Sequence, residues 1–269
     1  MFRSLILRAC LIGIVLGLAM TTMQVIGVTP ILLAAEQFEG QSDVQVEEQL
    51  NVGGADMALG HDHSHNHEQA HGDHDHHHGG EAWAPADGGE RLFYTMVSNI
   101  GAGIGFAAIL LVLLNQLHDR GRLTLTPLAG LTVGVLGYLA IFVAPSLGLP
   151  PEIPGASAAA LEARQTWWIT TVVAAAAGLA LLILATGWKR LLGLPLLLVP
   201  YSWVPSHEGP MFSHPDPQVV QALNELHREF IWATGITNLL FWLLAGLLCT
   251  LVLRRLTQAP LLVAHDTSA

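Results

Sequence analysis

The chain has 269 residues, of which 52% are hydrophobic and 12% are charged. A typical soluble domain has about a quarter of its residues charged, so this composition excludes an ordinary soluble globular protein and indicates a membrane protein. The formal net charge is −10, and the sequence offers no basic face for a nucleic-acid partner.

The chain contains several apolar runs that could cross a bilayer, which needs about 20 mostly apolar residues for each helix. Five runs qualify: residues 9–28, 92–114, 125–144, 167–187 and 230–253. A sixth run, residues 191–204, is shorter and is interrupted by two prolines. It is compatible with a kinked span, a re-entrant hairpin or an interfacial segment. The sequence predicts an all-α membrane protein with a bundle of about six, alternatively five, transmembrane helices.

The basic residues favour six spans over five. Short cytoplasmic loops are enriched in Lys and Arg, and the basic residues near the span ends form four clusters: Arg3 with Arg8, Arg120 with Arg122, Lys189 with Arg190, and Arg254 with Arg255. All four clusters lie on the same side of the membrane only if residues 191–204 also cross it. We then expect a multi-pass protein of the bacterial inner membrane with both termini in the cytoplasm.

Four parts follow from this topology. Residues 1–35 form the first transmembrane helix and its exit, and residues 36–91 form an acidic, His-rich extracytoplasmic loop. Residues 92–258 form the helical bundle, and residues 259–269 form a cytoplasmic tail. The first apolar run could also be a cleaved signal peptide, because it has a basic start and a small-residue pair near position 35. Its length favours an uncleaved anchor.

The most distinctive segment is residues 61–78, HDHSHNHEQAHGDHDHHH. Such a segment has almost nothing apolar to bury, so we expect it to be disordered. Imidazole and carboxylate groups bind divalent transition metals, and the spacing suits a flexible collector of low selectivity better than a structural zinc site. A merely polar loop or an expression tag is the alternative. The expected ligands are His61, His63, His65, His67, His71, His74, His76, His77 and His78, with Asp73 and Asp75.

A few polar residues lie inside or beside the spans: Gln24, Asn99 and Asn238, with Glu36 just after the first run. Polar groups are costly in hydrocarbon and usually face the interior of a bundle. They could line an ion path, or they could form ordinary hydrogen bonds between helices. The sequence has no phosphate-binding loop, no HExxH pair and no nucleophile elbow, so we predict neither an enzyme nor a bound organic cofactor.

Several stretches resemble the CbtA family, bacterial membrane proteins proposed as cobalt-transporter subunits. The resemblance covers nearly the whole chain. It rests on the run from Gln24 to Glu36, the Glu81-Ala-Trp-Ala-Pro-Ala-Asp-Gly88 motif, the proline-rich stretch 144–155, and the segments 163–168 and 237–242. It implies cobalt uptake, often tied to cobalamin supply, and a small companion subunit, CbtB, with one span. The family is usually described with five spans.

The leading hypothesis is therefore a lipid-embedded subunit of a divalent-cation importer. The resemblance favours Co²⁺, whereas a His-rich tract by itself would also hold Ni²⁺ or Zn²⁺. The second hypothesis is a metal-sensing or metal-buffering receptor that moves nothing. The third hypothesis is efflux. The predicted outward-facing His-rich loop argues against efflux, because an exporter gains little from capturing ions outside the cell.

Overall fold

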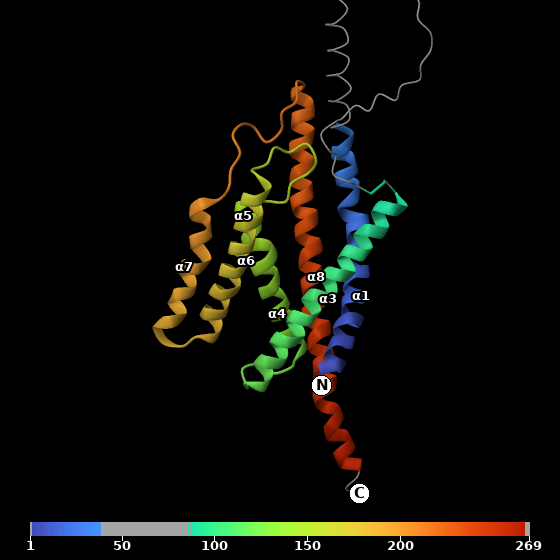
Figure 1. The fold of residues 1–269 in the computed structure, drawn as a ribbon, viewed down its shortest axis with the longest axis vertical. Helices are drawn as coiled ribbons and strands as arrows, with labels where there is room; N and C mark the ends of the chain where they lie inside the picture. The colour runs from blue at the N-terminus through green and yellow to red at the C-terminus, as the bar shows by residue number, and fades with distance from the viewer. Residues whose placement is uncertain (1, 39–84, 87, 267–269) are drawn as a thin grey trace, which may run out of the picture.

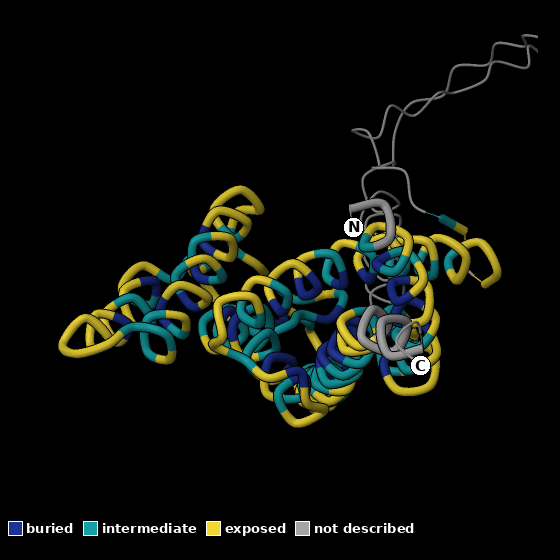
Figure 2. Tube along the Cα trace, turned by 90° about the horizontal axis from the view of Figure 1, so that it is seen from below, coloured by how far each residue is buried: buried dark blue, intermediate teal, exposed yellow. Residues whose placement is uncertain are grey.

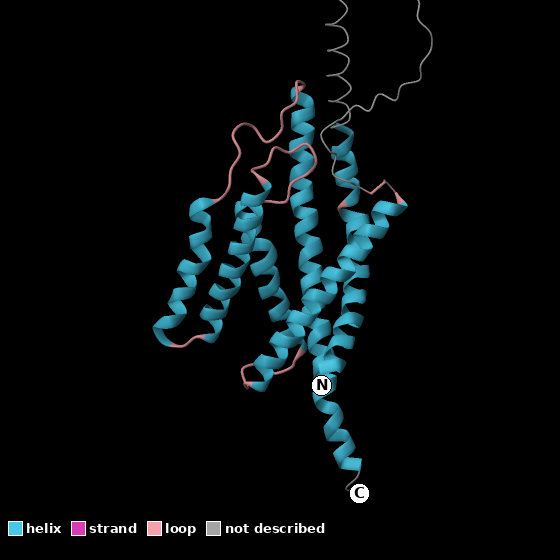
Figure 3. Cartoon of the chain, viewed as in Figure 1, coloured by secondary structure: helices cyan, strands magenta, loops and turns pink. Residues whose placement is uncertain are grey.

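A computed structural model describes residues 2–38, 85–86 and 88–266, with side chains over residues 5–38, 85–86 and 88–258. Within these ranges all regular secondary structure is helical (Figure 3), which confirms the predicted all-α fold class. The His-rich tract, residues 61–78, lies outside the described residues.

The helices follow one another up and down a single bundle (Figure 1). Helix α1 (Phe2–Gly27) is followed by a helical segment over 29–38, and α3 (Gly89–Asp119) begins after the undescribed loop. The remaining elements are α4 (Pro127–Tyr138), η1 (Leu139–Val143), α5 (Ala144–Gly148), α6 (Leu161–Leu184), η2 (Gly187–Leu192), α7 (Gly193–Leu198), η3 (Val199–Trp203) and α8 (Pro217–Asp266).

Five helices are long and apolar enough to cross a membrane, which matches the smaller of the two predicted numbers. They span Leu5–Gly27, Gly89–Asp119, Pro127–Gly148, Leu161–Leu184 and Pro217–Gln258. The sixth apolar run is a broken helical stretch made of η2, α7 and η3. It lies against α6 along its length and returns the chain to the end of the bundle from which α6 starts (Figure 1).

The third span contains a π-helical turn. Residues Leu139–Val143 form η1, between α4 and α5, and Pro145 sits in the first turn of α5. Proline lacks the N–H that a continuous helix would donate. The Tyr201 hydroxyl donates to the Ala144 carbonyl at 2.6 Å, and the Trp167 indole donates to the Pro200 carbonyl at 2.8 Å. These bonds tie the end of the broken stretch to α5 and α6.

Several glycines lie where two helices come into close backbone contact. Gly13 and Gly17 of α1 lie against Ile104 and Ile100 of α3, and Gly103 lies against Gly13. Gly130 and Gly134 of α4 approach α8 in the same way. Small residues let helices in lipid pack closely, where hydrophobic exclusion from water does not drive association. The main core lies where α1, α3, α4 and α8 meet.

The outward faces of the helices are apolar. Side chains such as Leu7, Ile26, Leu128 and Ile109 are exposed, and Figure 2 shows exposed residues along the outer faces of the bundle. A soluble protein rarely leaves such large contiguous apolar surfaces uncovered. Lipid is the solvent that fits them, and the chain is a multi-pass membrane protein.

A second, smaller core lies at the end of the bundle opposite the N-terminus. Val28 and Ala35, from the end of the first helical segments, pack with Phe212 and with Leu223 and Phe230 of α8. Helix α8 has 50 residues, about 75 Å at 1.5 Å per residue, against a hydrocarbon layer of about 30 Å. Its ends must therefore extend beyond the bilayer. This smaller core holds the segment that leads into the His-rich loop.

Candidate functional site

The polar residues predicted in the first two spans meet between α1 and α3. The Asn99 side-chain amide donates to the Gln24 side-chain oxygen at 2.6 Å and to the Thr21 hydroxyl oxygen at 3.0 Å. The Thr21 hydroxyl in turn donates to the Gly17 carbonyl at 2.9 Å. The sequence places these residues 75 and 78 positions apart, and the antiparallel pairing of the two helices brings them together.

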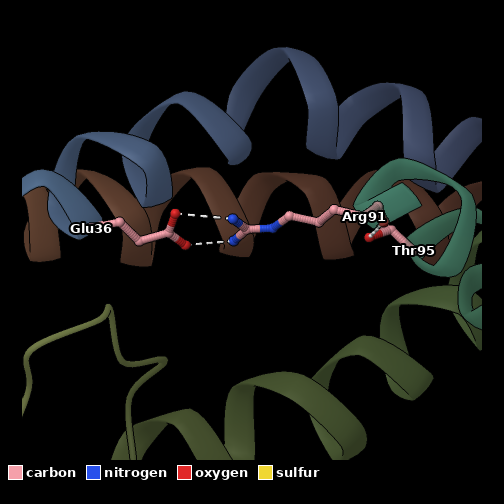
Figure 4. A network of polar contacts seen from close by, with 3 residues as sticks. All are labelled: Glu36, Arg91 and Thr95. Atoms are coloured by element: carbon pink, nitrogen blue, oxygen red, sulfur yellow. Dashed lines mark hydrogen bonds and ion pairs between the residues drawn. The ribbon is translucent and has the colours of Figure 1, made fainter. Parts of the chain in front are cut away.

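Nearer the end of the bundle that holds the smaller core, Glu36 forms a bidentate ion pair with Arg91 (Figure 4). The two Arg91 terminal nitrogens lie 2.6 and 3.0 Å from the two carboxylate oxygens. Each side chain is 31% exposed, and the Thr95 hydroxyl donates to the Arg91 carbonyl at 2.8 Å. Bidentate pairing of this kind fixes geometry as well as charge. The Glu36 carboxylate is thus already held by a cation.

Arg91 was not among the residues singled out from the sequence. A signal for it was present, since Arg91 is the one basic residue in the acidic segment 29–91. A lone cation among thirteen acidic residues predicts an ion pair with one of them. The partner, Glu36, is separated from it by 55 positions, and spacing along the chain could not identify it.

The seam between α1 and α3 closes toward the N-terminal end of α1. At Gly13 and Gly17 the backbones of the two helices are in direct contact with no room for a side chain. The polar group of Thr21, Gln24 and Asn99 therefore occupies only the half of the seam nearer Glu36. An ion could not follow this seam through the bundle in the conformation described.

Asn238, the remaining residue predicted for an ion path, stands apart from this group. Its side-chain amide donates to the Thr234 carbonyl of the preceding turn of α8, at 2.9 Å. Bonding of this kind satisfies a polar side chain within its own helix. Among the described side chains, no hydrogen bond joins Asn238 to Gln24, Glu36 or Asn99.

Two contacts fix the loop that precedes α6. Glu152 pairs with Arg164 of α6 at 2.8 Å, and a ring nitrogen of His227 lies 3.0 Å from the Pro151 carbonyl. The ring of His227 also packs edge-on against Phe212. These groups hold the loop between α5 and α6 against α8. Over residues 5–38, 85–86 and 88–258 no three His, Cys, Asp or Glu side chains are arranged to hold a metal ion.

We predict that Asn99→Leu destabilises the protein by weakening the contact between α1 and α3. The substitution removes two hydrogen bonds between α1 and α3 and leaves the Gln24 oxygen without this donor. Hydrogen bonds between membrane helices contribute about 0.6 kcal/mol on average and up to about 1.7 kcal/mol. The check is thermal unfolding of the wild-type and variant chains in detergent.

Asn238→Leu is the matched control, because its side chain bonds only within α8. We expect it to affect stability less than Asn99→Leu. Loss of uptake by folded Asn99→Leu protein, at unchanged stability, would instead favour the ion-path hypothesis for this group.

Comparison with known proteins yields one family. The family model for CbtA, described as a probable cobalt transporter subunit, matches residues 2–254. The chain matches no curated protein and no solved structure. The match covers nearly the whole chain, including the first four candidate spans, most of the fifth and the segment between α1 and α3. The chain therefore belongs to the CbtA family of probable cobalt transporter subunits.

Proposed function

We propose that this chain is the integral membrane subunit of an uptake system for divalent transition-metal ions, with Co²⁺ as the principal cargo. The observation that carries this proposal is the family match across residues 2–254 of a chain with five helices able to span a membrane. The family is described as a transporter subunit, which implies partner subunits. The exposed apolar faces of the helices imply that lipid surrounds the chain.

The distribution of charge supports an orientation for the bundle. Figure 1 places the start of α1, the α3–α4 turn, the α6–η2 turn and the end of α8 at one end. This end holds Arg8, Arg120, Arg122, Lys189, Arg190, Arg254 and Arg255, with Asp119. Basic residues are enriched on the cytoplasmic side of membrane proteins. The opposite end holds Glu36, Glu90, Glu152 and Glu162, two of which are paired with Arg91 and Arg164. This end would then face outward together with the His-rich loop.

The same orientation requires that the broken stretch of η2, α7 and η3 crosses the membrane. Within this stretch, η2 and α7 have 6 residues each and η3 has 5. A 3₁₀-helix rises about 2.0 Å per residue and an α-helix about 1.5 Å, so the stretch is about 30 Å long. That length equals the hydrocarbon thickness of a typical bilayer, about 30 Å. The 3₁₀ turns would allow a run too short for a regular α-helical span to cross.

This topology predicts opposite labelling of two engineered cysteines. In a chain with Cys10 and Cys249 replaced by alanine, we expect Ser206→Cys to react with a membrane-impermeant maleimide in intact spheroplasts. Thr186→Cys is expected to react only after permeabilisation. Both positions are exposed and flank the broken stretch. Gln258→Cys, near the end of α8, serves as the inward-facing control. Labelling of residues 186 and 206 from the same side would show that the stretch is re-entrant.

The His-rich tract is proposed to capture ions outside the membrane. It would raise the local concentration of metal at the outward end of the bundle, where the acidic residues also lie. Neutral imidazole binds the metal, and the ordinary pKa of imidazole is about 6.5. Capture should therefore weaken as the external pH falls from 7 to 5. The ions would then pass to the bundle near Glu36, whose charge is shared with Arg91.

The path through the membrane is proposed to be completed by partner subunits, with a single-span, CbtB-like companion as the expected one. The seam that contains Gln24 and Asn99 is closed at Gly13 and Gly17. The described side chains provide no group of three metal ligands. Polar groups from a second chain, or a different packing of α1 on α3, would be needed to carry an ion across.

The test is accumulation of labelled cobalt in cells that lack their own importers. We expect cells that express this chain with its companion to accumulate cobalt, and cells with either chain alone to accumulate little. The alternative function is a metal-sensing or metal-buffering receptor, which the metal-binding tract would serve equally well. Metal bound at the cell surface without entry, when both chains are present in the membrane, would favour the receptor.

A further inference from the structure

A cleft of about 600 Å³ opens between α3, α4 and α6. Helix α6 meets the rest of the bundle chiefly at η1 and α5, so α4 and α6 diverge toward the basic end. The walls of the cleft are almost entirely apolar, and Phe106 of α3 and Trp242 of α8 also line it. Small side chains on α6, Ala176 and Ala180, leave space along one wall.

The polar groups of the cleft are concentrated at its basic end. Arg122, in the α3–α4 turn, lines the cleft and donates to the Leu184 carbonyl at the end of α6, at 2.6 Å. This bond bridges the two helices that the cleft separates. The guanidinium has five N–H donors and is exposed. The Thr124 and Thr126 residues line the cleft beside it.

Further positive charge lies on the two segments that Arg122 joins. Arg120 is at the C-terminal end of α3, and Lys189 and Arg190 are in η2, just after α6; all three are exposed. On these segments the one acidic side chain among the described residues is Asp119, which accepts a bond from Asn115 at 2.7 Å. The cleft therefore combines an apolar interior with one cation, Arg122, in its lining and further cations on the adjoining segments.

We propose that this cleft binds an anionic phospholipid, with an acyl chain between α3, α4 and α6 and the phosphate at Arg122. Basic pockets between membrane helices bind anionic lipid headgroups, and arginine binds phosphate oxygens through paired donors. The volume lies in the range of ligand pockets, about 300–1,000 Å³. The lipid would fill the gap and hold α6 in position relative to α4.

Native mass spectrometry of the full chain tests this site, with dioleoylphosphatidylglycerol and dioleoylphosphatidylcholine as the two probes. After delipidation and addition of both lipids, we expect the wild-type chain to retain one phosphatidylglycerol. Its preference over phosphatidylcholine should be about fivefold, which is the effect of one arginine near an anionic headgroup. Arg122→Gln should lose the preference. Arg122→Lys should keep most of it. Arg120→Gln, which alters a cation outside the cleft lining, should reduce the preference much less than Arg122→Gln does.

A second pair of variants tests the apolar part of the site. Ala180→Phe fills the cleft and should reduce retention of both lipids, whereas Ala177→Phe, exposed on α6 but outside the lining, should not. Equal retention of the two lipids by the wild-type chain would overturn the proposal, as would an unchanged preference in Arg122→Gln. Loss of the lipid when a companion subunit is co-purified would assign this face to a protein helix instead.

Discussion

Gly103→Val is expected to prevent stable pairing of α1 with α3. A Cβ at this position would lie 2.6 Å from the Gly13 carbonyl oxygen, which is backbone and cannot rotate away. Gly103 is buried in the packed half of the seam, opposite the glycines of α1. Overpacking in a close-packed interior costs about 1–3 kcal/mol and occasionally more. The expected result is a large loss of folded protein in detergent, measured as the monodisperse fraction after stepwise heating.

Gly101→Val is the matched control for this substitution. Gly101 is in the same helix, two residues away, and a Cβ there has no neighbour within 4 Å. The intrinsic cost of placing valine in the helix is the same at both positions. We expect Gly101→Val to behave nearly as the wild-type chain does. Similar stability of the two variants would mean that α1 and α3 do not pack as described.

Removal of the His-rich tract is expected to affect uptake at low metal concentration. Replacement of residues 61–78 by a Gly/Ser sequence of equal length should raise the external cobalt concentration for half-maximal uptake by about three- to tenfold, equivalent to roughly 0.7–1.4 kcal/mol. The maximal rate should stay the same, because the tract is proposed to collect ions and not to conduct them. The measurement is initial uptake of labelled cobalt over a range of concentrations.

A variant that keeps the nine histidines with Asp73 and Asp75 and neutralises Asp62 and Glu68 separates ligation from simple charge. We expect it to retain most of the advantage of the wild-type tract at pH 7. The difference between the wild-type and Gly/Ser chains should shrink as the external pH falls to 5, since protonated imidazole does not bind metal. An unchanged uptake curve in the Gly/Ser chain would remove the collector role.

The membrane class and the positions of the spans could be predicted because hydrophobicity in lipid is a property of single segments. Each of the five long runs, such as residues 92–114, contains enough apolar residues to form a span without reference to any other part of the chain. The structure extends several of them, and α3 begins at Gly89 and ends at Asp119. Capping and fraying determine such ends, and composition does not.

The stretch 191–204 was harder to predict, because its form depends on its neighbours. Because the run is short and contains two prolines, the sequence was compatible with a kinked span, a re-entrant hairpin or an interfacial segment. In the structure the indole of Trp167 and the hydroxyl of Tyr201 hold η3 against α5 and α6, and these contacts come from residues up to 57 positions apart. No local pattern could have predicted them.

In the candidate site, too, the sequence predicted the polar residues themselves but not the contacts between them. The sequence identified Gln24, Asn99 and Glu36 as polar groups in or beside the spans, and the structure brings Gln24 and Asn99 together. The sequence alone could not show that the Asn99 amide joins two helices, or that Arg91 forms an ion pair with Glu36. Helical periodicity locates a residue on its own helix, whereas pairing between helices depends on the register set by the glycines at 13, 17 and 103.

The most direct test of the account is metal entry into sealed vesicles that contain this chain and the proposed companion subunit. With an inside-negative membrane potential, labelled Co²⁺ is expected to accumulate in the lumen, and Ni²⁺ and Zn²⁺, compared side by side, are expected to enter more slowly. Vesicles with either chain alone should accumulate little. Metal that binds to the vesicles but never reaches the lumen, with both chains present, would contradict a role in transport.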